Sequence, residues 1–385
     1  MIARRIAVFL CLVPATISAQ VNGESAIDSA KAGAQPVGPQ LDFSGMMFAN
    51  YQYRGDDGPA QSANKFEIER VYLTFRIPAG DRLGVRVTTD VFQQATSGND
   101  SYYRGWTIRA KFAYLQYNYL NGRDWQASAK IGLLQTAFIE HDEQYWPRFI
   151  ALSPTDRAAY VSPADAGIAN TITLPRKLGQ IYATITNGPG YTSREVDRFK
   201  DYAARLTVTP WAGNKFSPLH GVALTAWGYK GATASRFVDG GDGQLGSVGS
   251  SLARNRWGLH VGNLNPRFTF GAEYASRMEE GEVGANTLSS PREVIDSTGT
   301  LWSAYGAVRP FRREPAPHPL SLIGRYDRVN TNTDSGTKYE VAIVGLSWDL
   351  SSKVSASLDY QENSPLKGTP VSRSHTWFAH FVARF

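Results

Sequence analysis

The last residues of the chain alternate strictly between two kinds of side chain. One parity is wholly apolar, namely Trp377, Ala379, Phe381, Ala383 and Phe385. The other parity includes a histidine and an arginine, in the order Phe378, His380, Val382 and Arg384. A period of two predicts an extended strand between two different surroundings. A final aromatic residue on such a strand is typical of a closed membrane barrel, in which no strand edge can face lipid. A soluble sandwich strand shows the same alternation, so that alternative remains open at this point.

The N-terminus has the pattern of a secretory signal. Arg4 and Arg5 precede the apolar run 6–13, and small residues follow up to Ala19. We therefore expect residues 1–19 to be a cleaved signal peptide and residues 20–41 to form a periplasmic leader. The only cysteine, Cys11, lies in the signal, so the mature chain has no disulfide and no thiolate.

Composition narrows the class of protein further. No apolar run approaches 18 residues, which excludes membrane-spanning helices, while aromatic residues make up 12% of the chain. The formal net charge of +6 includes the two signal arginines, so the mature chain carries 6 − 2 = +4. These charges form no dense basic stripe, and we predict no nucleic-acid partner.

Long and short connections alternate along residues 42–385. Odd-numbered connections are long and rich in Gly, Ser and Asn, whereas even-numbered ones are short turns such as 79–81 and 121–124. A transmembrane barrel with a periplasmic N-terminus has this asymmetry, because its external loops are longer than its periplasmic turns. The sequence thus predicts an all-β fold: an antiparallel transmembrane β-barrel of about 16 strands in a bacterial outer membrane.

Charged residues share one parity in several predicted strands. They are Arg70, Arg76, Arg86, Lys111, Lys130 and Arg205. A charge that faces lipid near the midplane costs roughly 2–4 kcal/mol, so we expect this parity to face the lumen. A barrel of this size is too wide for side chains to fill, and its lumen holds water.

The third external connection, residues 135–165, is the longest stretch without strand alternation. It carries the charged candidates Glu140, Asp142, Glu143 and Arg148. If this loop folds into the lumen, its acids would face the basic parity and create a transverse field that filters solutes. The alternative is a solvated surface loop with no specific role.

The chain resembles Gram-negative porins and is most similar to the phosphate-selective porin O/P family. The resemblance is carried by Phe43–Gly45, the run Phe66–Leu73, the loop run Glu143–Arg148 and the terminal Phe385. It implies a sixteen-stranded, trimeric outer-membrane channel that favours anions. The chain departs from the family in having no run of closely spaced arginines, which leaves phosphate selectivity open.

The function expected is passive diffusion of small hydrophilic solutes with a mild preference for anions. Alternatives are a sugar-specific channel that stacks its solute on Tyr72, Phe112 and Tyr114, a barrel-scaffold hydrolase, or an adhesin. We expect no enzymatic activity, cofactor or metal. The run Gly241–Gly246 matches a dinucleotide fingerprint, but it lies in a Gly/Ser loop without the strand and helix that such a site needs. Expected partners are membrane lipid, outer-leaflet lipopolysaccharide, small solutes or anions, and two further copies of the chain.

Overall fold

A computed structural model describes most of the chain. The described residues are 41–55, 64–93, 105–195, 197–214, 217, 219–234, 251–283, 293–310, 320–334, 336–366 and 373–385. The expected signal peptide, the expected leader up to residue 40 and the motif at 241–246 lie outside this part of the chain.

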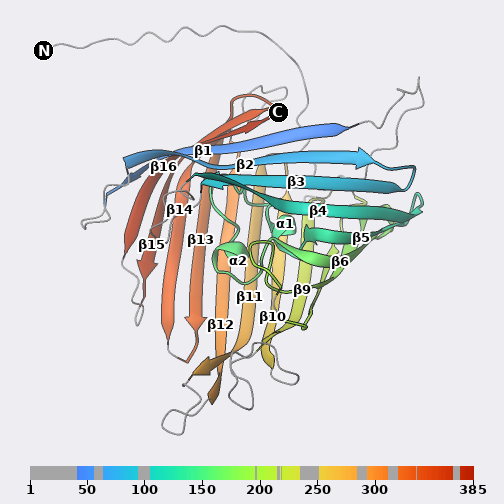
Figure 1. Ribbon diagram of the computed structural model, residues 1–385. Coiled ribbons are helices and arrows are strands. Elements are labelled where there is room, and N and C mark those ends of the chain that lie inside the picture. The colour runs from blue at the N-terminus through green and yellow to red at the C-terminus, as the bar shows by residue number, and fades with distance from the viewer. Residues whose placement is uncertain are drawn as a thin grey trace, which may run out of the picture.

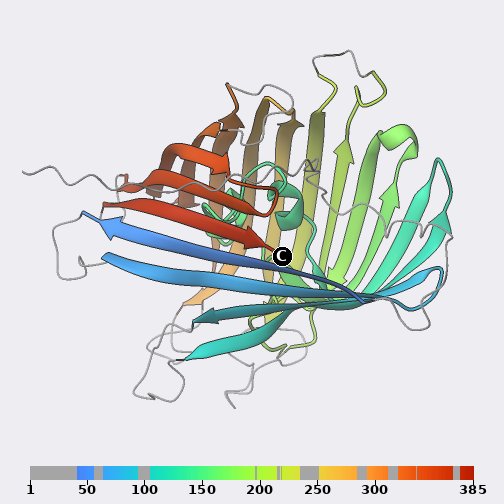
Figure 2. The ribbon, with the colours of Figure 1, turned by 90° about the horizontal axis from the view of Figure 1, so that it is seen from above.

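Sixteen strands close into one barrel, and every neighbouring pair is antiparallel (Figures 1 and 2). The strands are β1 (Asp42–Arg54), β2 (Asn64–Pro78), β3 (Leu83–Gln93), β4 (Trp106–Asn121), β5 (Gln126–Gln135), β6 (Ala164–Thr173), β7 (Gly179–Thr186), β8 (Asp201–Val208), β9 (Val222–Ala234), β10 (Ser251–Leu264), β11 (Phe268–Val283), β12 (Glu293–Val308), β13 (Leu320–Asn332), β14 (Thr337–Asp349), β15 (Val354–Pro365) and β16 (Ser374–Arg384). The predicted fold class and strand number are confirmed.

The barrel closes where the last strand pairs with the first. Along this seam Met46 pairs with Arg384 and Asn50 with His380, as the terminal alternation predicted. The final residue extends the ladder, because Gly45 N–H donates to the Phe385 carbonyl at 2.7 Å and Phe385 N–H donates back at 3.0 Å. The Phe385 ring lies over Gly45, where a Cβ would meet it at 2.2 Å. Only glycine accommodates this ring without rearrangement.

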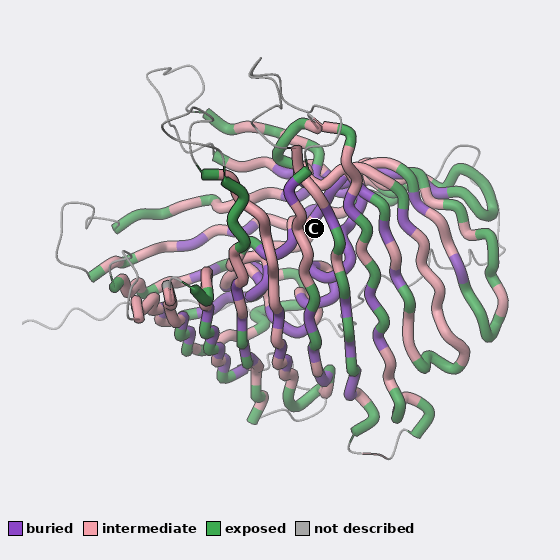
Figure 3. Tube along the Cα trace, turned by 90° about the horizontal axis from the view of Figure 1, so that it is seen from below, coloured by how far each residue is buried: buried purple, intermediate pink, exposed green. Residues whose placement is uncertain are grey.

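The alternation of side chains separates the two faces of the wall, visible as bands of buried and exposed residues along the strands (Figure 3). Leu115, Ile131, Ile168 and Ile185 pair across β4–β7 in one continuous row and are all exposed on the outer face. Inward neighbours in the same strands include Lys130 and Thr184, which are buried. The apolar parity therefore faces lipid and the charged parity faces the lumen.

The register shifts at four places among the described strand pairs, and two of these β-bulges lie near the predicted site residues. The β1–β2 register changes between Phe48 and Ala49, which leaves Glu69 as an extra residue in β2. The β3–β4 register changes between Thr88 and Thr89, which leaves Lys111 as an extra residue in β4. An extra residue in a strand reverses the parity beyond it.

The third external connection folds into the barrel. It contains two short helices, α1 (Ile139–Asp142) and α2 (Pro154–Arg157), which lie inside the ring of strands (Figure 1). Its apolar tip residues Tyr145, Trp146 and Ile150 pack against inward side chains of distant strands, among them Phe48 of β1 and Ile343 of β14. None of the helices in the described residues is long and apolar enough to span a membrane.

One predicted boundary is wrong by a few residues. The third connection was expected at 135–165, whereas Gln135 belongs to β5 and both Ala164 and Asp165 belong to β6. Charged and polar residues dominate these strand ends, so hydrophobic alternation gives no signal there.

Two adjacent residues of β4 test the assignment of faces. Leu115 is 40% exposed on the outer face, whereas Gln116 points inward and donates to Asn118. We expect Leu115→Lys to lower the free energy of unfolding in lipid vesicles by about 2 kcal/mol or more, because the ammonium group would lie on the apolar outer face, against hydrocarbon in a single copy and against a neighbouring apolar surface in an assembly. Gln116→Lys is the matched control and should cost much less. Equal losses for the two variants in denaturant titrations would contradict the assignment.

Candidate functional site

Six cations on the inner faces of β2–β5 and β8 form what we term the basic wall. They are Arg70, Arg86, Arg109, Lys111, Lys130 and Arg205. Five were predicted from parity, and Arg109 was missed. Because the bulge at Lys111 reverses the alternation, Arg109 turns inward and Ile108, 68% exposed, turns outward. The break in alternation between Lys111 and Phe112 is the sequence signal for this shift.

Aromatic rings of the same wall lie beneath these cations. The Lys111 ammonium is 4.3 Å from the ring centroid of Tyr72, and the Arg86 guanidinium is 4.8 Å from that of Phe112. A third pair, Lys130 over Tyr114, is 4.9 Å apart. Cation–π attraction at such distances holds the flexible side chains against the wall.

The third loop presents acidic groups to this wall at one point. Glu140 of α1 lies 3.8 Å from Arg86, which is the opposition of loop acid and wall base that the sequence predicted. The Glu140 side chain is 33% exposed and that of Arg86 is 13% exposed, so water reaches both. Solvent therefore reaches the lumen beside this ion pair, and we call that water-accessible part of the lumen the passage.

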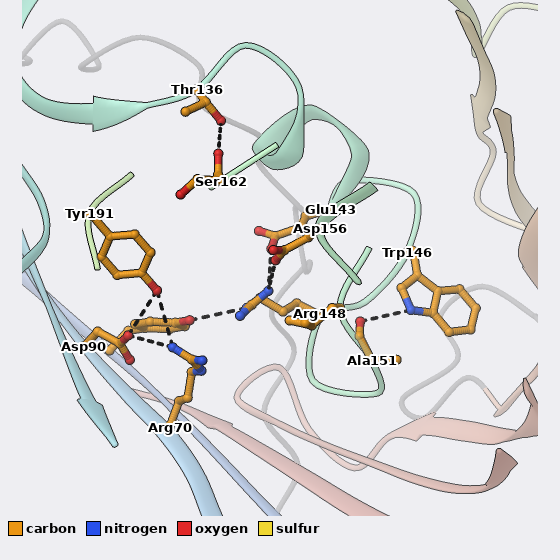
Figure 4. Close-up of polar contacts among 12 residues, drawn as sticks. Arg70, Asp90, Thr136, Glu143, Trp146, Arg148, Ala151, Asp156, Ser162 and Tyr191 are labelled. Carbon is orange, nitrogen blue, oxygen red and sulfur yellow. Dashed lines mark hydrogen bonds and ion pairs between the residues drawn. The ribbon is translucent and has the colours of Figure 1, made fainter. Parts of the chain in front are cut away.

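Arg148 joins the loop to the wall (Figure 4). Its guanidinium donates to Glu143 at 3.2 Å and to Asp156 at 2.9 Å, both within the loop, and its Nε donates to the Tyr72 hydroxyl at 3.3 Å. Burial alone would lower the pKa of Arg148, but Tyr72, Glu143 and Asp156 together raise it above its ordinary value. Burial raises the pKa of Asp156, and Arg148 partly opposes that rise. Arg148 is thus a permanent cation between two acids.

Asp142 does not face the basic wall, contrary to the expectation. It is fully buried on the opposite side of the loop, where it accepts a hydrogen bond from the Tyr305 hydroxyl of β12. Successive helical residues rotate by about 100°, so Glu140 and Asp142 point to opposite sides of α1. Nothing in the sequence indicated this single helical turn. We therefore expected Glu140, Asp142 and Glu143 to face the basic wall together.

One predicted wall cation lies away from the loop, and two others contact its first residues. Arg76 lies toward the periplasmic end of β2, 44% exposed and 3.8 Å from Asp42, away from the loop. Lys130 donates to Gln135 Oε1 at 3.3 Å, and Arg205 donates to the Ala137 carbonyl at 3.0 Å. Lys130 and Arg205 therefore hold the start of the loop in place.

Asp90 of β3 was not among the predicted site residues. Its fully buried carboxylate accepts from Arg70 at 2.6 Å and from Arg109 at 2.8 Å. Tyr191, from the connection between β7 and β8, accepts from Arg109 at 3.1 Å and caps this cluster (Figure 4). Asp90 therefore balances two of the wall's arginines, whereas Lys111 has no carboxylate within ion-pair distance among the described residues.

The described residues give no support for a metal site here. In the described part of the chain, no group of three or more His, Cys, Asp or Glu side chains is placed to hold a metal ion. The arrangement consists of fixed charges on the loop and the lumen wall, which can attract, repel and align solutes.

Comparison with known proteins gives a fold but no family. No protein-family model matches the sequence, and no curated protein does. The resemblance to the phosphate-selective porin O/P family consequently remains an expectation.

Solved structures match over nearly the whole chain. The outer-membrane channel DcaP of Acinetobacter baumannii has a TM-score of 0.57 at 14% identity and covers 91% of this chain and 99% of its own. An anion-selective porin from Comamonas acidovorans has a TM-score of 0.56 at 10% identity, covering 90% and 100%. OmpT of Vibrio cholerae, in a trimer form, has a TM-score of 0.56 at 10% identity, covering 90% and 99%. At these identities the likeness establishes the fold alone: the chain is a transmembrane β-barrel of the bacterial outer membrane.

Arg148 provides a test of how the loop is held. Arg148→Gln would leave Glu143 and Asp156 without their cation, and breaking a buried ion pair by removing one partner typically costs about 3–5 kcal/mol. We expect backbone amides of residues 140–160 to exchange hydrogen at least tenfold faster, measured by mass spectrometry in detergent micelles. Arg76→Gln, at a distance from the loop, serves as the control and should leave this exchange unchanged. Unaltered protection in Arg148→Gln would show that the apolar packing alone fixes the loop.

Proposed function

We propose that the chain is a porin that lets small hydrophilic solutes diffuse passively through the outer membrane, with a mild preference for anions. The observation that carries this proposal is the solvent exposure of the Glu140 carboxylate on the inward-folded loop, where it pairs with Arg86 of the wall. Fixed charges of opposite sign across a narrowing select permeants by charge and size.

The charge balance around the passage favours anions. Seven cations lie on this side of the lumen, namely the six residues of the basic wall and Arg148. Five carboxylates oppose them, namely Glu69, Asp90, Glu140, Glu143 and Asp156. Asp142 lies away from the passage, so it does not offset the excess of two positive charges. This excess is small, and we propose a modest preference rather than strict exclusion of cations.

The sugar-channel alternative has less support. It requires Tyr72, Phe112 and Tyr114 to offer bare ring faces to a solute. Each of these rings is covered by a cation of the same wall and is at most 8% exposed. A neutral sugar would have to displace a charged side chain to stack there.

Single-channel recording in planar lipid bilayers tests the porin proposal directly. We expect stable ohmic steps that grow in proportion to salt concentration, as a water-filled passage produces. Protein that inserts but passes no current would overturn the proposal and favour an adhesin or another plugged barrel.

The preference for anions can be tested with a matched pair of arginine variants. Arg86→Gln removes a cation at the passage, and we expect the chloride-to-potassium permeability ratio to fall by about twofold, read from the reversal potential in a tenfold KCl gradient. Arg76→Gln removes the same charge near the periplasmic end, beside Asp42, where the passage is wide and screened by salt. Equal shifts in both variants would contradict a selective role for the passage.

We also propose that three copies assemble, with membrane lipid and lipopolysaccharide around them. β7 and β8 have only eight residues each, whereas a tilted strand needs about 9–11 to cross the hydrocarbon core. The outer face beside them carries small residues such as Ala129 and Ala183 and the Tyr119–Asn170 hydrogen bond at 3.0 Å. A neighbouring copy would cover this low, uneven part of the wall. Light scattering that returned the mass of one chain per micelle would contradict this assembly.

A further inference from the structure

A row of polar side chains crosses the lumen wall behind the third loop. Directly paired positions on six consecutive strands, β8 to β13, carry Thr207, Thr225, His260, Glu273, Ser303 and Asp327. Neighbouring strands lie about 4.8 Å apart, so this row is continuous. We call these six residues the polar row. It lies on the side of the loop opposite the passage.

Part of the polar row lacks hydrogen-bond partners. Both ring nitrogens of His260 and both carboxylate oxygens of Glu273 are buried without a partner, and each residue is only 4% exposed. Asp142 of the loop, within electrostatic reach of Glu273, likewise has one buried oxygen without a partner. Buried polar groups are rarely left unsatisfied unless they have a role or hold a proton or water. This cluster is the largest unexplained polar feature of the described residues.

Two adjacent loop residues are attached to this wall, in addition to Leu152, whose carbonyl accepts from Arg325 of β13. His141 Nε2 lies 2.9 Å from the Thr225 hydroxyl on β9, and Asp142 accepts from Tyr305 on β12. Both side chains are at most 5% exposed. Glu140, on the opposite side of the same helical turn, pairs with Arg86 beside the passage. The position of Glu140 in the lumen is therefore linked to these two attachments through one turn of α1.

We propose that His141 and Asp142 form a proton-dependent latch that holds the third loop against the wall and keeps the passage open. The latch rests on the proposed porin function. When it is released, the loop moves away from β9–β12 into the passage and interrupts the current. His141 and Asp142 are positioning residues, because they act through the loop and do not touch the permeating solute.

The charges around the latch explain its dependence on protons. Groups that face it from the packed elements are Arg205 (β8), His260 (β10), Glu273 (β11), Tyr305 (β12), Arg325 and Asp327 (β13), and Glu143 and Tyr145 of the loop itself. Arg325 is already paired with Asp327 at 2.6 Å. If Asp142 and Glu273 were both ionised, two further negative charges would share an enclosed space with no cation of their own. The latched state therefore retains a proton on this pair.

The two latch residues respond to pH in opposite directions. Burial raises the pKa of Asp142 to about 7, so latching through Asp142 is strongest at low pH and weakens as the pH rises from about 4 to about 7. Burial, with Arg205 and His260 nearby, lowers the pKa of His141 well below 6.5, so latching through His141 weakens as the pH falls below 6.5. Between about pH 4 and 6.5 the two effects oppose each other. The intact channel should therefore show a nearly constant closing frequency over this range.

Single-channel recordings of two isosteric variants of the full chain test the latch. Asp142→Asn keeps an acceptor for Tyr305 but cannot ionise, and His141→Gln keeps a group that can bond to Thr225 but cannot take up a proton. We expect closures in Asp142→Asn to become more frequent as the pH falls from 6.5 to 4, and closures in His141→Gln to become more frequent as it rises from 4 to 7. The change in each case should approach tenfold per pH unit, the limit for one linked proton.

Two controls separate the latch from simple structural damage. Tyr305→Phe removes a hydrogen bond but no charge, so it should increase closures without altering their pH profile. Tyr160→Phe removes a buried loop hydroxyl that has no partner among the described residues, and it should change nothing. If both isosteric variants keep a flat pH profile, the latch is wrong although the porin stands. If neither the unmodified chain nor any variant conducts current, the proposed function itself fails.

Discussion

The backbone of a strand in lipid must find every hydrogen bond within the protein, and this requirement governs the whole structure. No water is available in the hydrocarbon core, so an open sheet edge would cost several kcal/mol for each unpaired group. The pairing of β1 with β16, extended by Phe385 over Gly45, removes the last free edges. Once the ring is closed, side chains can only point outward or inward. The apolar outer surface and the polar lumen are consequences of that closure.

The third loop occupies part of the lumen of the barrel. Its apolar residues pack against strands on several sides of the lumen, while Glu140 and Glu143 remain near water. Its two faces therefore meet different environments. One face opposes the basic wall across a hydrated gap, and the other buries His141 and Asp142 against β9–β12. Charges near water can act on solutes, whereas charges that are buried respond to protons, because desolvation makes ionisation expensive only on the buried side.

Arg109 and Asp142 show where reasoning from the sequence stops. Parity identified five of the six cations of the basic wall correctly as inward-facing, because strand alternation is a local property. It missed Arg109 because a single extra residue at Lys111 reverses the phase, and a bulge depends on pairing with β3 rather than on β4 itself. It misplaced Asp142 because a four-residue helix has too few residues to show a period. It also gave no hint of Asp90 as a shared counter-ion, since Arg70 and Arg109 come from different strands.

The sequence by itself determined the fold class, the approximate number of strands and the face on which most charges lie. These follow from side-chain alternation and connection length, both of which are written in short stretches of chain. Only the tertiary structure decided that the third loop enters the lumen, which of its acids meets Arg86, and that Thr225, His260 and Glu273 lie side by side. These facts depend on contacts between residues that are far apart in sequence, such as Asp142 and Tyr305. Such contacts are fixed by strand register and loop packing, which no local pattern encodes.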